Sequence, residues 1–369
     1  MSYNAIVGLG NAGTQIVKLA SESPFLSDVK KFAIDSVLSN LDMDTVSAFS
    51  YIHVISDDKT GSGRNRDRGA AMYKYHEDEG HFKEMYETLR GAKSPVVVIT
   101  SAAGGTGSGS IIPFCKAMHE RDIEVIPIII CPNMADPAAY HLNTNDMMIE
   151  LDEIGITTYS VFRNVKSGAS YELINKEVVE LIELIFGKHY KPTDKDSIDD
   201  SDLDVVLSTP GRFVGIIETA NTLDELKRNI ARKLFNGYQP GWDVKDTETP
   251  TFVTAFGLTS MFAADEFDAA FEEVNGRIID KYDEYRNIVV DDNDGKYTAT
   301  VLISGLNHAE LKIIDTNFKT AGKLASGMKK AERPSFISNR KASIVKAEDL
   351  SPADTKQLQG AASKFKWKK

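Results

Sequence analysis

One stretch decides the fold: Ser94-Pro95-Val96-Val97-Val98-Ile99-Thr100-Ser101-Ala102-Ala103-Gly104-Gly105-Thr106-Gly107-Ser108-Gly109-Ser110. Its first half is a run of β-branched residues, which predicts a short strand buried on both faces. Its second half is a loop of small residues, and we predict a helix over residues 111–121 behind it. Glycines let a backbone turn tightly and approach a ligand, and a helix start presents unpaired N–H groups. This order of strand, loop and helix predicts a phosphate-binding loop, with a flexible turn as the alternative.

Two further glycine loops each follow a predicted strand. The first occupies Gly8 to Gly13 near the start of the chain and satisfies G-x-G-x-x-G, with a helix expected over residues 14–20. The second runs from Asp57 to Gly69, after a strand over 51–55 and before a helix over 70–89. A lone G-x-G-x-x-G serves dinucleotides and mononucleotides alike, so its value here lies in the company of the other loops.

Strands and helices alternate through the first half of the chain, which predicts a mostly parallel sheet with helices on both faces. Further strands are expected over 31–35, 123–131 and 157–162, with a helix over 143–154. Pro127 inside the second of these strands predicts an edge position or a bulge. Ligands of such sheets bind at the carboxyl ends of the strands, where all three glycine loops fall. A triphosphate needs several such loops.

A second α/β region is expected after a long amphipathic helix over residues 171–186. An acidic run from Lys191 to Asp204 separates the two parts, and its plain interpretation is a solvated linker. The expected elements beyond the run are strand 213–217, helix 222–235, strand 252–258, helix 265–286, a hairpin over 287–305 that turns at Asp292 to Gly295, and helix 308–321.

Charge and composition restrict the class of protein. The chain has 369 residues and a net charge of −11, which argues against its body binding nucleic acid. The segment from Lys329 onward holds 11 Lys and Arg against 4 Asp and Glu, so we expect a mobile basic tail. Cys115 and Cys131 lack a CxxC partner and are expected to be buried thiols, with no metal ligands. With no leader and no long apolar run, we expect a cytoplasmic protein that does not contact a membrane.

A nicotinamide-dependent oxidoreductase is the main alternative function. Asp35 lies 22 residues after Gly13, where a dinucleotide-binding fold would place an acid for a ribose hydroxyl. This alternative leaves the other two glycine loops and the acidic run without a role, and no spacing suggests a His–Asp pair for hydride transfer.

The central loop, Ala103 to Gly109, closely resembles GGGTG[ST]G, the signature of the tubulin/FtsZ GTPase superfamily, with Ala103 in place of the first glycine. The stretch from Gly61 to Gly69 resembles that superfamily's γ-phosphate loop, G-x-G-x-N-x-x-x-G, and the first loop matches in place and order. The resemblance spans roughly residues 1–320. It implies GTP or GDP as the nucleotide and phosphate contacts from Gly10, Asn11, Ala12, Gly61, Gly63, Asn65, Gly104, Gly105, Thr106, Gly107 and Ser108.

The same resemblance implies three contacts to the guanine base and ribose. Tyr171 matches the ring that stacks on guanine, and Asn175 matches the amide that pairs with its edge. Residues four apart share one face of a helix, and an amide can both donate and accept hydrogen bonds. Asn164, directly after its strand, matches the second guanine or ribose contact.

The acidic run resembles the superfamily's catalytic N-x-D-x-x-D pattern. Asp199 and Asp202 have the D-x-x-D spacing, Ser197 stands in the asparagine position, and a register shifted to Asp200 and Asp204 remains open. The resemblance implies that these acids complete the GTPase site of the next subunit, with Mg²⁺ on the phosphates. It also implies a head-to-tail filament whose assembly activates hydrolysis.

The implied organisation is a GTP-binding domain over 1–170, a central helix and acidic loop over 171–208, an activation domain over 209–327 and a basic tail over 328–369. Within the superfamily the chain looks most like the TubZ branch, the segregation tubulins of plasmids and phages. That likeness implies that the tail binds a DNA-binding adaptor at a centromere-like DNA. Direct contact of the tail with DNA and a merely solubilising tail are the alternatives. A relative that assembles without hydrolysing GTP is a further rival.

Overall fold

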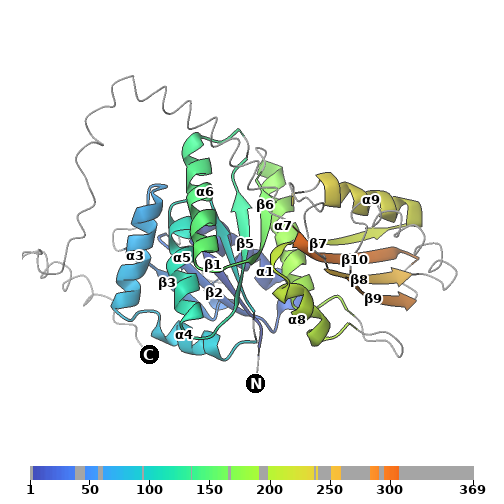
Figure 1. The fold of residues 1–369 in the computed structure, drawn as a ribbon, viewed down its shortest axis with the longest axis horizontal. Coiled ribbons are helices and arrows are strands. Elements are labelled where there is room, and N and C mark those ends of the chain that lie inside the picture. The colour runs from blue at the N-terminus through green and yellow to red at the C-terminus, as the bar shows by residue number, and fades with distance from the viewer. Residues whose placement is uncertain are drawn as a thin grey trace, which may run out of the picture. The chain divides into compact units, whose positions relative to one another are not determined.

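The computed structural model describes residues 3–37, 46–56, 61–93, 95–133, 135–164, 168–190, 198–236, 238–239, 251–258, 283–290 and 295–306 (Figure 1). The predicted helix over 308–321 and the basic tail lie outside these residues, as does most of the predicted helix over 265–286. The division into four segments therefore stays a prediction.

Six parallel strands form the first part of the sheet, in the order β3-β2-β1-β4-β5-β6. The parallel pairing of all neighbours confirms the expected parallel sheet. Parallel neighbours need a crossover connection that passes over a face of the sheet. The strands are β1 (Ala5–Leu9), β2 (Lys30–Asp35), β3 (Tyr51–Val54), β4 (Val96–Ser101), β5 (Val125–Cys131) and β6 (Thr158–Arg163).

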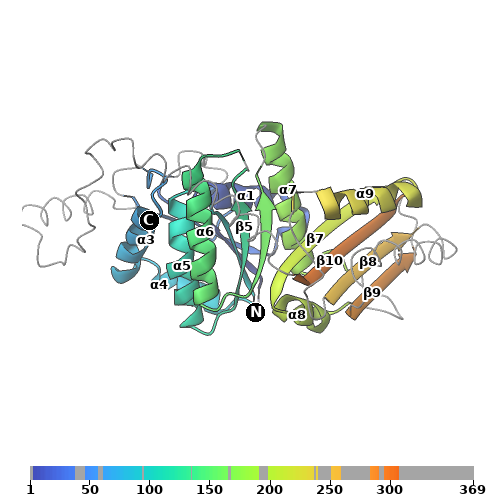
Figure 2. The ribbon, with the colours of Figure 1, turned by 45° about the horizontal axis from the view of Figure 1, so that its top comes forward.

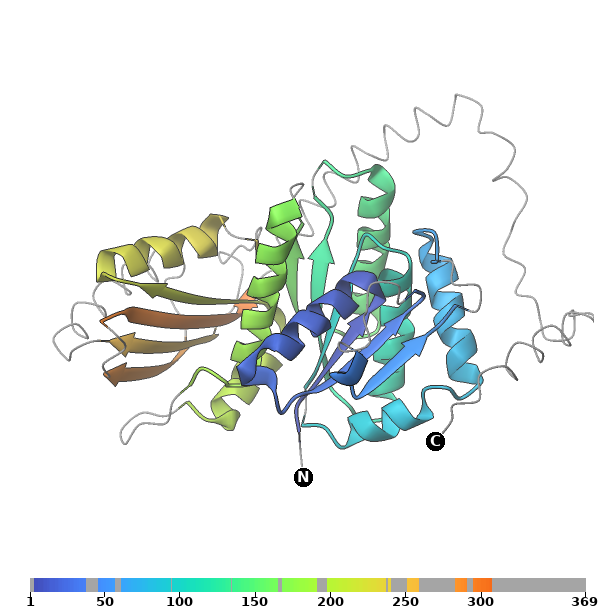
Figure 3. The same ribbon diagram turned by 180° about the vertical axis from the view of Figure 1, so that it is seen from behind.

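Helices cover both faces of this sheet. Helices α3 to α6 pack on one face and α1 and α7 on the other, as Figures 1 and 3 show from opposite sides. A short 3-10 helix, η1, follows α1. The helices are α1 (Gly10–Glu22), η1 (Pro24–Leu26), α3 (Arg66–Asp78), α4 (Lys83–Arg90), α5 (Thr106–His119), α6 (Ala138–Glu153) and α7 (Gly168–Ile185).

Strand β4 is buried on both faces, as its run of β-branched residues predicts. Val96 and Val98 belong to the core under α3 to α6, whereas Val97 and Ile99 belong to the core under α1 and α7. Each of these side chains contributes about 1.5–3 kcal/mol when it is fully buried. The strand that carries the central loop is therefore fixed in the middle of the molecule.

The second part of the sheet continues from β6. Strand β7 joins β6 through a short parallel contact, β10 lies antiparallel between β7 and β8, and β9 runs parallel to β8 at the edge (Figure 2). Its elements are α8 (Asp200–Ser208), β7 (Gly211–Ala220), α9 (Leu223–Asn236), β8 (Thr251–Leu258), β9 (Asp283–Val290) and β10 (Tyr297–Leu306).

Helix α7 packs against both parts, as its apolar stripe predicts. Val178, Leu181 and Ile182 are buried in one cluster with Phe213 of β7 and Leu302 of β10. The expected long helix that links an α/β region to a second α/β region is thus confirmed.

Two predictions in the second part are wrong. Residues 287–305 do not form a hairpin, because β10 pairs with β7 and β8 and does not contact β9 in the sheet order. The predicted helix over 265–286 does not reach its expected end, because residues 283–286 already belong to strand β9. Pairing between distant segments overrode the local turn signal at Asp292 to Gly295.

Three predictions in the first part need smaller corrections. The helix expected over 70–89 is two helices, α3 and α4, because Gly80 turns the chain with a φ of 78°. The prediction of an edge position is wrong, because β5 lies between β4 and β6 in the sheet. The pairing of β5 with β6 begins at Ile128, one residue beyond Pro127, so the proline has no partner on β6 to which an N–H would donate. Helix α5 begins at Thr106 and not at residue 111, so most of the predicted glycine loop is the first turn of a helix.

Candidate functional site

The three glycine loops meet at one cavity of about 440 Å³, at the carboxyl ends of β1, β2 and β4. This is the edge of a parallel sheet at which ligands bind. The cavity is lined by Leu9, Gly10, Asn11, Ala12, Asp35, Ser36, Val37, Gly61, Ser62, Gly63, Arg64, Ser101, Gly104, Gly105, Thr106 and Gly107.

Two helices begin at the cavity. Helix α1 starts at Gly10 and α5 at Thr106, and neither has a side-chain hydrogen bond capping its first turn. The first N–H groups of both helices therefore lack the side-chain acceptor that caps many helices, and the positive ends of both dipoles lie at one cavity. Such an arrangement binds phosphate or another anion.

The glycines allow the loops to touch backbone to backbone. A Cβ atom at Gly107 would lie 2.6 Å from the carbonyl oxygen of Leu9, and one at Gly105 would lie 2.6 Å from the backbone nitrogen of Asn65. Gly10 has a φ of 71° and approaches the nitrogen of Gly107. The glycines are thus required by close packing of the loops.

Three buried hydroxyl groups join the loops across the cavity. The Thr106 hydroxyl donates to Ser62 Oγ at 3.1 Å, and Ser36 Oγ lies 2.8 Å from Thr106 Oγ1. These hydrogen bonds connect the end of β2, the central loop and the glycine loop from Gly61 to Gly69. Sequence analysis missed Ser36 and Ser62, which only their positions directly beside Asp35 and between Gly61 and Gly63 could have indicated.

Asp35 is a buried carboxyl in the cavity wall and is only 4% exposed. Burial raises its pKa to about 6, although the backbone N–H groups of Ser36 and Val37 oppose the shift. One carboxyl oxygen accepts from the Ser36 backbone N–H at 2.7 Å. The cavity therefore holds a carboxyl group that takes up a proton at about pH 6, closer to neutral pH than an ordinary aspartate does.

Helix α6 contacts the central loop and the glycine loop from Gly61 to Gly69 from one side. The Asn143 side-chain amide donates to the carbonyl oxygens of Arg64, Ala103 and Gly104 at 3.2, 3.3 and 3.4 Å. Two turns further along, Glu150 accepts two hydrogen bonds of 2.6 Å from Arg66, whose Nε also donates to the Ser108 carbonyl at 3.1 Å. The pair with Arg66 lowers the pKa of Glu150. No motif in the sequence pointed to α6.

Nine predicted phosphate contacts line the cavity, and two lie beside it. Asn65 begins α3 as its N-cap, because its side-chain oxygen accepts from the Arg68 backbone N–H at 2.9 Å. The Ser108 hydroxyl is buried and donates to the Gly104 carbonyl. The residues in the cavity wall are Gly10, Asn11, Ala12, Gly61, Gly63, Gly104, Gly105, Thr106 and Gly107.

The three predicted base contacts do not line this cavity. Tyr171 is 46% exposed on α7, and Asn175 lines a separate cavity of about 760 Å³ between α1, η1 and α7. Asn164 directly follows β6, and its backbone N–H donates to the Cys131 carbonyl at 2.9 Å. Their roles toward guanine stay predictions.

The acidic run becomes the start of helix α8. The Asp199 carboxylate accepts from the backbone N–H groups of Ser201 and Asp202 at 2.8 and 3.2 Å, and Asp202 accepts from the Asp199 backbone N–H at 3.0 Å. This is a capping box. The Ser201 hydroxyl, together with the two backbone N–H groups, lowers the pKa of Asp199. Asp199 is therefore charged near neutral pH, and it is fully exposed.

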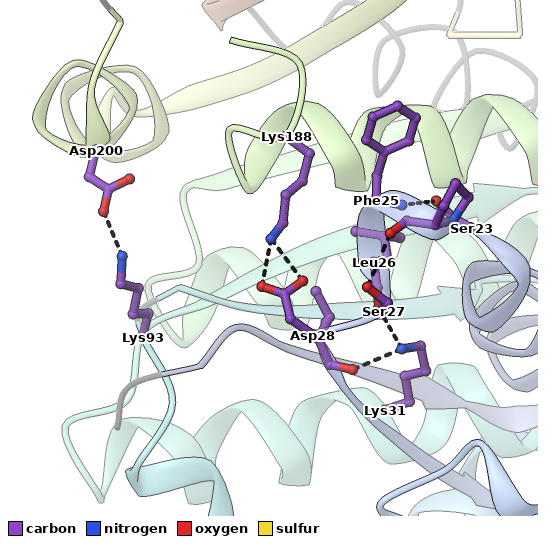
Figure 4. A network of polar contacts seen from close by, with 11 residues as sticks. Ser23, Phe25, Leu26, Ser27, Asp28, Lys31, Lys93, Lys188 and Asp200 are labelled. Carbon is purple, nitrogen blue, oxygen red and sulfur yellow. Dashed lines mark hydrogen bonds and ion pairs between the residues drawn. The ribbon is translucent and has the colours of Figure 1, made fainter. Parts of the chain in front are cut away.

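Asp199 and Asp202 lie near the amino ends of the parallel strands, at the edge of the sheet opposite to the cavity. Asp200 pairs at 2.6 Å with Lys93, which precedes β4 (Figure 4). Ser101, at the far end of β4, lines the cavity. A strand of six residues spans about 17–20 Å. A second pair, Lys188 with Asp28 at 2.8 Å, lies at the same edge (Figure 4). The acids cannot reach the cavity of their own chain.

Among the residues that the structure describes, no helix combines the length and apolar character needed to cross a membrane.

No protein-family model and no curated protein matches the sequence. Solved structures do match it. A GDP-form protofilament of TubZ from Bacillus thuringiensis serovar israelensis is 16% identical, with a TM-score of 0.70 over 89% of this chain and 94% of that chain. CetZ from Methanosaeta thermophila is 18% identical, with a TM-score of 0.68 over 89% and 94%. An FtsZ dimer of M. jannaschii is 15% identical, with a TM-score of 0.62 over 84% and 93%. The arrangement of strands, loops and helices described above is therefore the tubulin/FtsZ fold.

Proposed function

We propose that this chain is a GTP-hydrolysing cytoskeletal protein that assembles head to tail into filaments. The observation that carries the proposal is the separation of two incomplete halves of one site. An anion-binding cavity with two helix N-termini lies at one edge of the sheet, and Asp199 and Asp202 lie at the other. Stacking one subunit on the next brings the two halves together, and a contact of this head-to-tail kind does not close on itself.

Hydrolysis in such a site depends mainly on position and charge. A water oxygen bonds to the γ-phosphorus while the bond from that phosphorus to the β–γ bridging oxygen breaks, so GDP leaves with the electron pair. Asp199 and Asp202 of the next subunit orient this water. Because hydrogen bonds lower the pKa of Asp199, its carboxylate is a weak base. Its role is to orient the water, and the water proton passes on to a phosphate oxygen or to solvent.

The cavity also fits a magnesium ion bound with the nucleotide. Mg²⁺ prefers oxygen ligands and is held by one or two carboxylates together with phosphate oxygens. Asp35 offers one carboxyl group, and the hydroxyls of Ser36, Ser62 and Thr106 lie beside it. When bound, the ion would neutralise phosphate charge. Among the described residues no cluster of His, Cys, Asp or Glu could hold a metal alone, so the ion would need the nucleotide.

We further propose that the filament moves plasmid or phage DNA through an adaptor bound by the basic tail. The support is the charge of the segment after Lys329, set against a net charge of −11 for the whole chain. A basic segment can capture an acidic surface at long reach. Binding of the isolated adaptor to full-length chain, but not to a chain that ends at residue 328, would test this step.

The oxidoreductase alternative is not favoured. A dinucleotide fold uses one glycine loop and leaves its acid free for a ribose hydroxyl. Here three loops share one cavity, and the Asp35 carboxyl is buried and already accepts from the Ser36 backbone N–H.

The first test follows light scattering and phosphate release after GTP and Mg²⁺ are added to the purified chain. We expect scattering above a threshold concentration, with turnover per monomer rising above the same threshold. Turnover that is independent of concentration and of polymer would contradict a site shared between subunits.

A sharper test uses Asp199→Asn and Asp202→Asn. Asparagine caps a helix as well as aspartate does, so these changes remove charge and keep α8 in place. We expect assembly with GTP to persist and phosphate release to fall at least tenfold. Mixing Asp199→Asn with Gly104→Val, which adds bulk to the cavity wall at a position with room for a Cβ, should restore part of the turnover, because mixed filaments contain intact sites. Loss of assembly in Asp199→Asn, or no recovery in the mixture, would refute catalysis across the subunit contact.

A further inference from the structure

The cavity contains one cationic side chain among the described residues that line it. That residue is Arg64, and the only other charged residue in the same wall is Asp35. The central loop from Ala103 to Ser110 carries no lysine or arginine. A bound triphosphate would bring several negative charges to this cavity, so its neutralisation falls to backbone N–H groups and to this arginine.

The backbone of Arg64 is held in an unfavourable conformation. Its φ is 62°, and among the described residues other than glycine only Asp122 shares a positive φ. Left-handed backbone is disfavoured for long side chains, and such residues concentrate at functional sites. Glycine or asparagine would occupy this position at lower cost. The guanidinium group therefore accounts for the arginine, since the turn itself does not require one.

The side chain of Arg64 is held much more loosely than its backbone. Asn143 fixes the Arg64 carbonyl oxygen with a hydrogen bond of 3.2 Å, whereas the guanidinium carbon lies 4.9 Å from the ring centre of Tyr140. Arg64 is exposed, and a cation–π contact at an exposed site is weak. Within the described part of the chain no carboxylate pairs with this guanidinium. A phosphate group would be a stronger partner than the ring.

We propose that Arg64 binds the terminal phosphate of the nucleotide in its own subunit, leaving Tyr140 when GTP enters. The proposal rests on the proposed function and names the residue that distinguishes GTP from GDP at that site. Arg64 lines the cavity together with its neighbours Gly61 and Gly63 of the γ-phosphate loop, so a guanidinium that leaves the Tyr140 ring can turn toward a phosphate held there. A guanidinium that bridges phosphate oxygens also stabilises the charge that moves during phosphoryl transfer.

The test compares the dissociation constants of GTPγS and GDP, measured below the assembly threshold. Arg64→Asn removes the charge and suits the left-handed backbone, and Arg64→Lys keeps the charge without the fork of donors. We expect Arg64→Asn to raise the dissociation constant of GTPγS by about tenfold or more and that of GDP by less than about twofold. The dissociation constant of GTPγS for Arg64→Lys should lie between those of Arg64→Asn and the unaltered chain. Arg90→Ala is the control, because it removes an exposed arginine of α4 that does not line the cavity. It should change neither constant.

Two outcomes would overturn the proposal. Equal weakening of both nucleotides by Arg64→Asn would mean that the residue only shapes the loop, and no weakening would mean that it touches no phosphate. Tyr140→Leu adds a second measurement and should leave the affinity for GTPγS unchanged or higher. A loss of affinity as large as that of Arg64→Asn would mean that the guanidinium acts while it contacts the Tyr140 ring, against the proposal. Failure of the unaltered chain to bind either nucleotide would instead refute the proposed function, so the two failures are distinguishable.

Discussion

Asp35 and Asp199, at opposite ends of the parallel strands, lie in opposite environments that shift their pKa values in opposite directions. Asp35, at the cavity, is 4% exposed and its pKa is raised to about 6 by burial. Asp199, at the start of α8, is fully exposed and hydrogen bonds lower its pKa. The first carboxyl is surrounded by loops that pack backbone to backbone, and the second belongs to a helix cap beside an exposed ion pair.

The difference shows how the two halves of a shared site can be built. At Gly10, Gly105 and Gly107 the cavity edge has no spare room, so an added atom there must displace a backbone group. The acidic edge consists of exposed charges whose net contribution to stability is small. We therefore expect substitutions at these three glycines to alter folding and binding together. Substitutions at the acidic edge should alter turnover and leave folding unchanged.

The largest expected effect comes from comparing alanine substitutions at two adjacent glycines, Gly104 and Gly105. Gly105→Ala would place a Cβ 2.6 Å from the Asn65 backbone nitrogen, whereas at Gly104 the nearest atom would be 3.9 Å away. We expect Gly105→Ala to lower the free energy of unfolding by about 3 kcal/mol and to abolish GTP binding. Gly104→Ala should change stability by less than about 0.5 kcal/mol. Urea unfolding measures the stability of the two variants, and a nucleotide-binding assay measures their affinity for GTP. Equal losses in Gly104→Ala and Gly105→Ala would contradict the steric explanation.

The next effect depends on pH. The folded pKa of Asp35 is about 6 and its ordinary value is 3.8, so the folded state binds the proton more tightly. Stability from this group is therefore present below about pH 4 and is lost as pH rises to about 6. In nucleotide-free protein, Asp35→Asn should raise the free energy of unfolding by up to about 3 kcal/mol at pH 7.5.

Unfolding of both proteins from pH 4 to pH 8 measures this difference. The gain from Asp35→Asn should vanish towards pH 4, because the carboxyl is then protonated in both states. Asp199→Asn serves as the matched control and should show no such gain at high pH. A gain that is constant across the range would argue against ionisation of Asp35 as its cause.

A third prediction concerns the brace between α3 and α6. Arg66 and Glu150 form a two-fold hydrogen-bonded pair in which the Arg66 side chain is only 11% exposed. Charge-assisted pairs of this kind contribute more than neutral hydrogen bonds, so Arg66→Met should cost about 2 kcal/mol in the free energy of unfolding. The double variant Arg66→Met with Glu150→Met should cost less than the two single changes added together. Simple additivity in a thermal or urea cycle would show that the pair is not coupled.

The smallest effect is expected at the acidic edge. Lys93 and Asp200 are 49% and 80% exposed, and exposed pairs contribute little. Lys93→Ala should therefore lower stability by less than about 1 kcal/mol and leave assembly unchanged. A larger loss, seen in the same urea experiment, would mean that this ion pair holds α8 against the first part of the sheet.

Sequence alone determined the features that depend on neighbouring residues. The run Val96 to Thr100 predicted a buried strand, and the three glycine loops predicted a phosphate site at the carboxyl edge. The structure brings nine of the predicted contacts together there. Such signals are readable because period, β-branching and glycine act within a few residues.

Tertiary structure decided what depends on distant residues. Thr106 meets Ser36 across 70 positions, and α6 reaches Arg66 across 84. Strand β10 inserts between β7 and β8 although a local turn signal favoured a hairpin. The separation of Asp35 from Asp199 also follows only from the direction of the strands, because Asp35 ends β2 whereas Asp200, beside Asp199, pairs with Lys93 before the start of β4. Each of these contacts is set by packing the whole chain around one sheet, and no local pattern in the sequence records it.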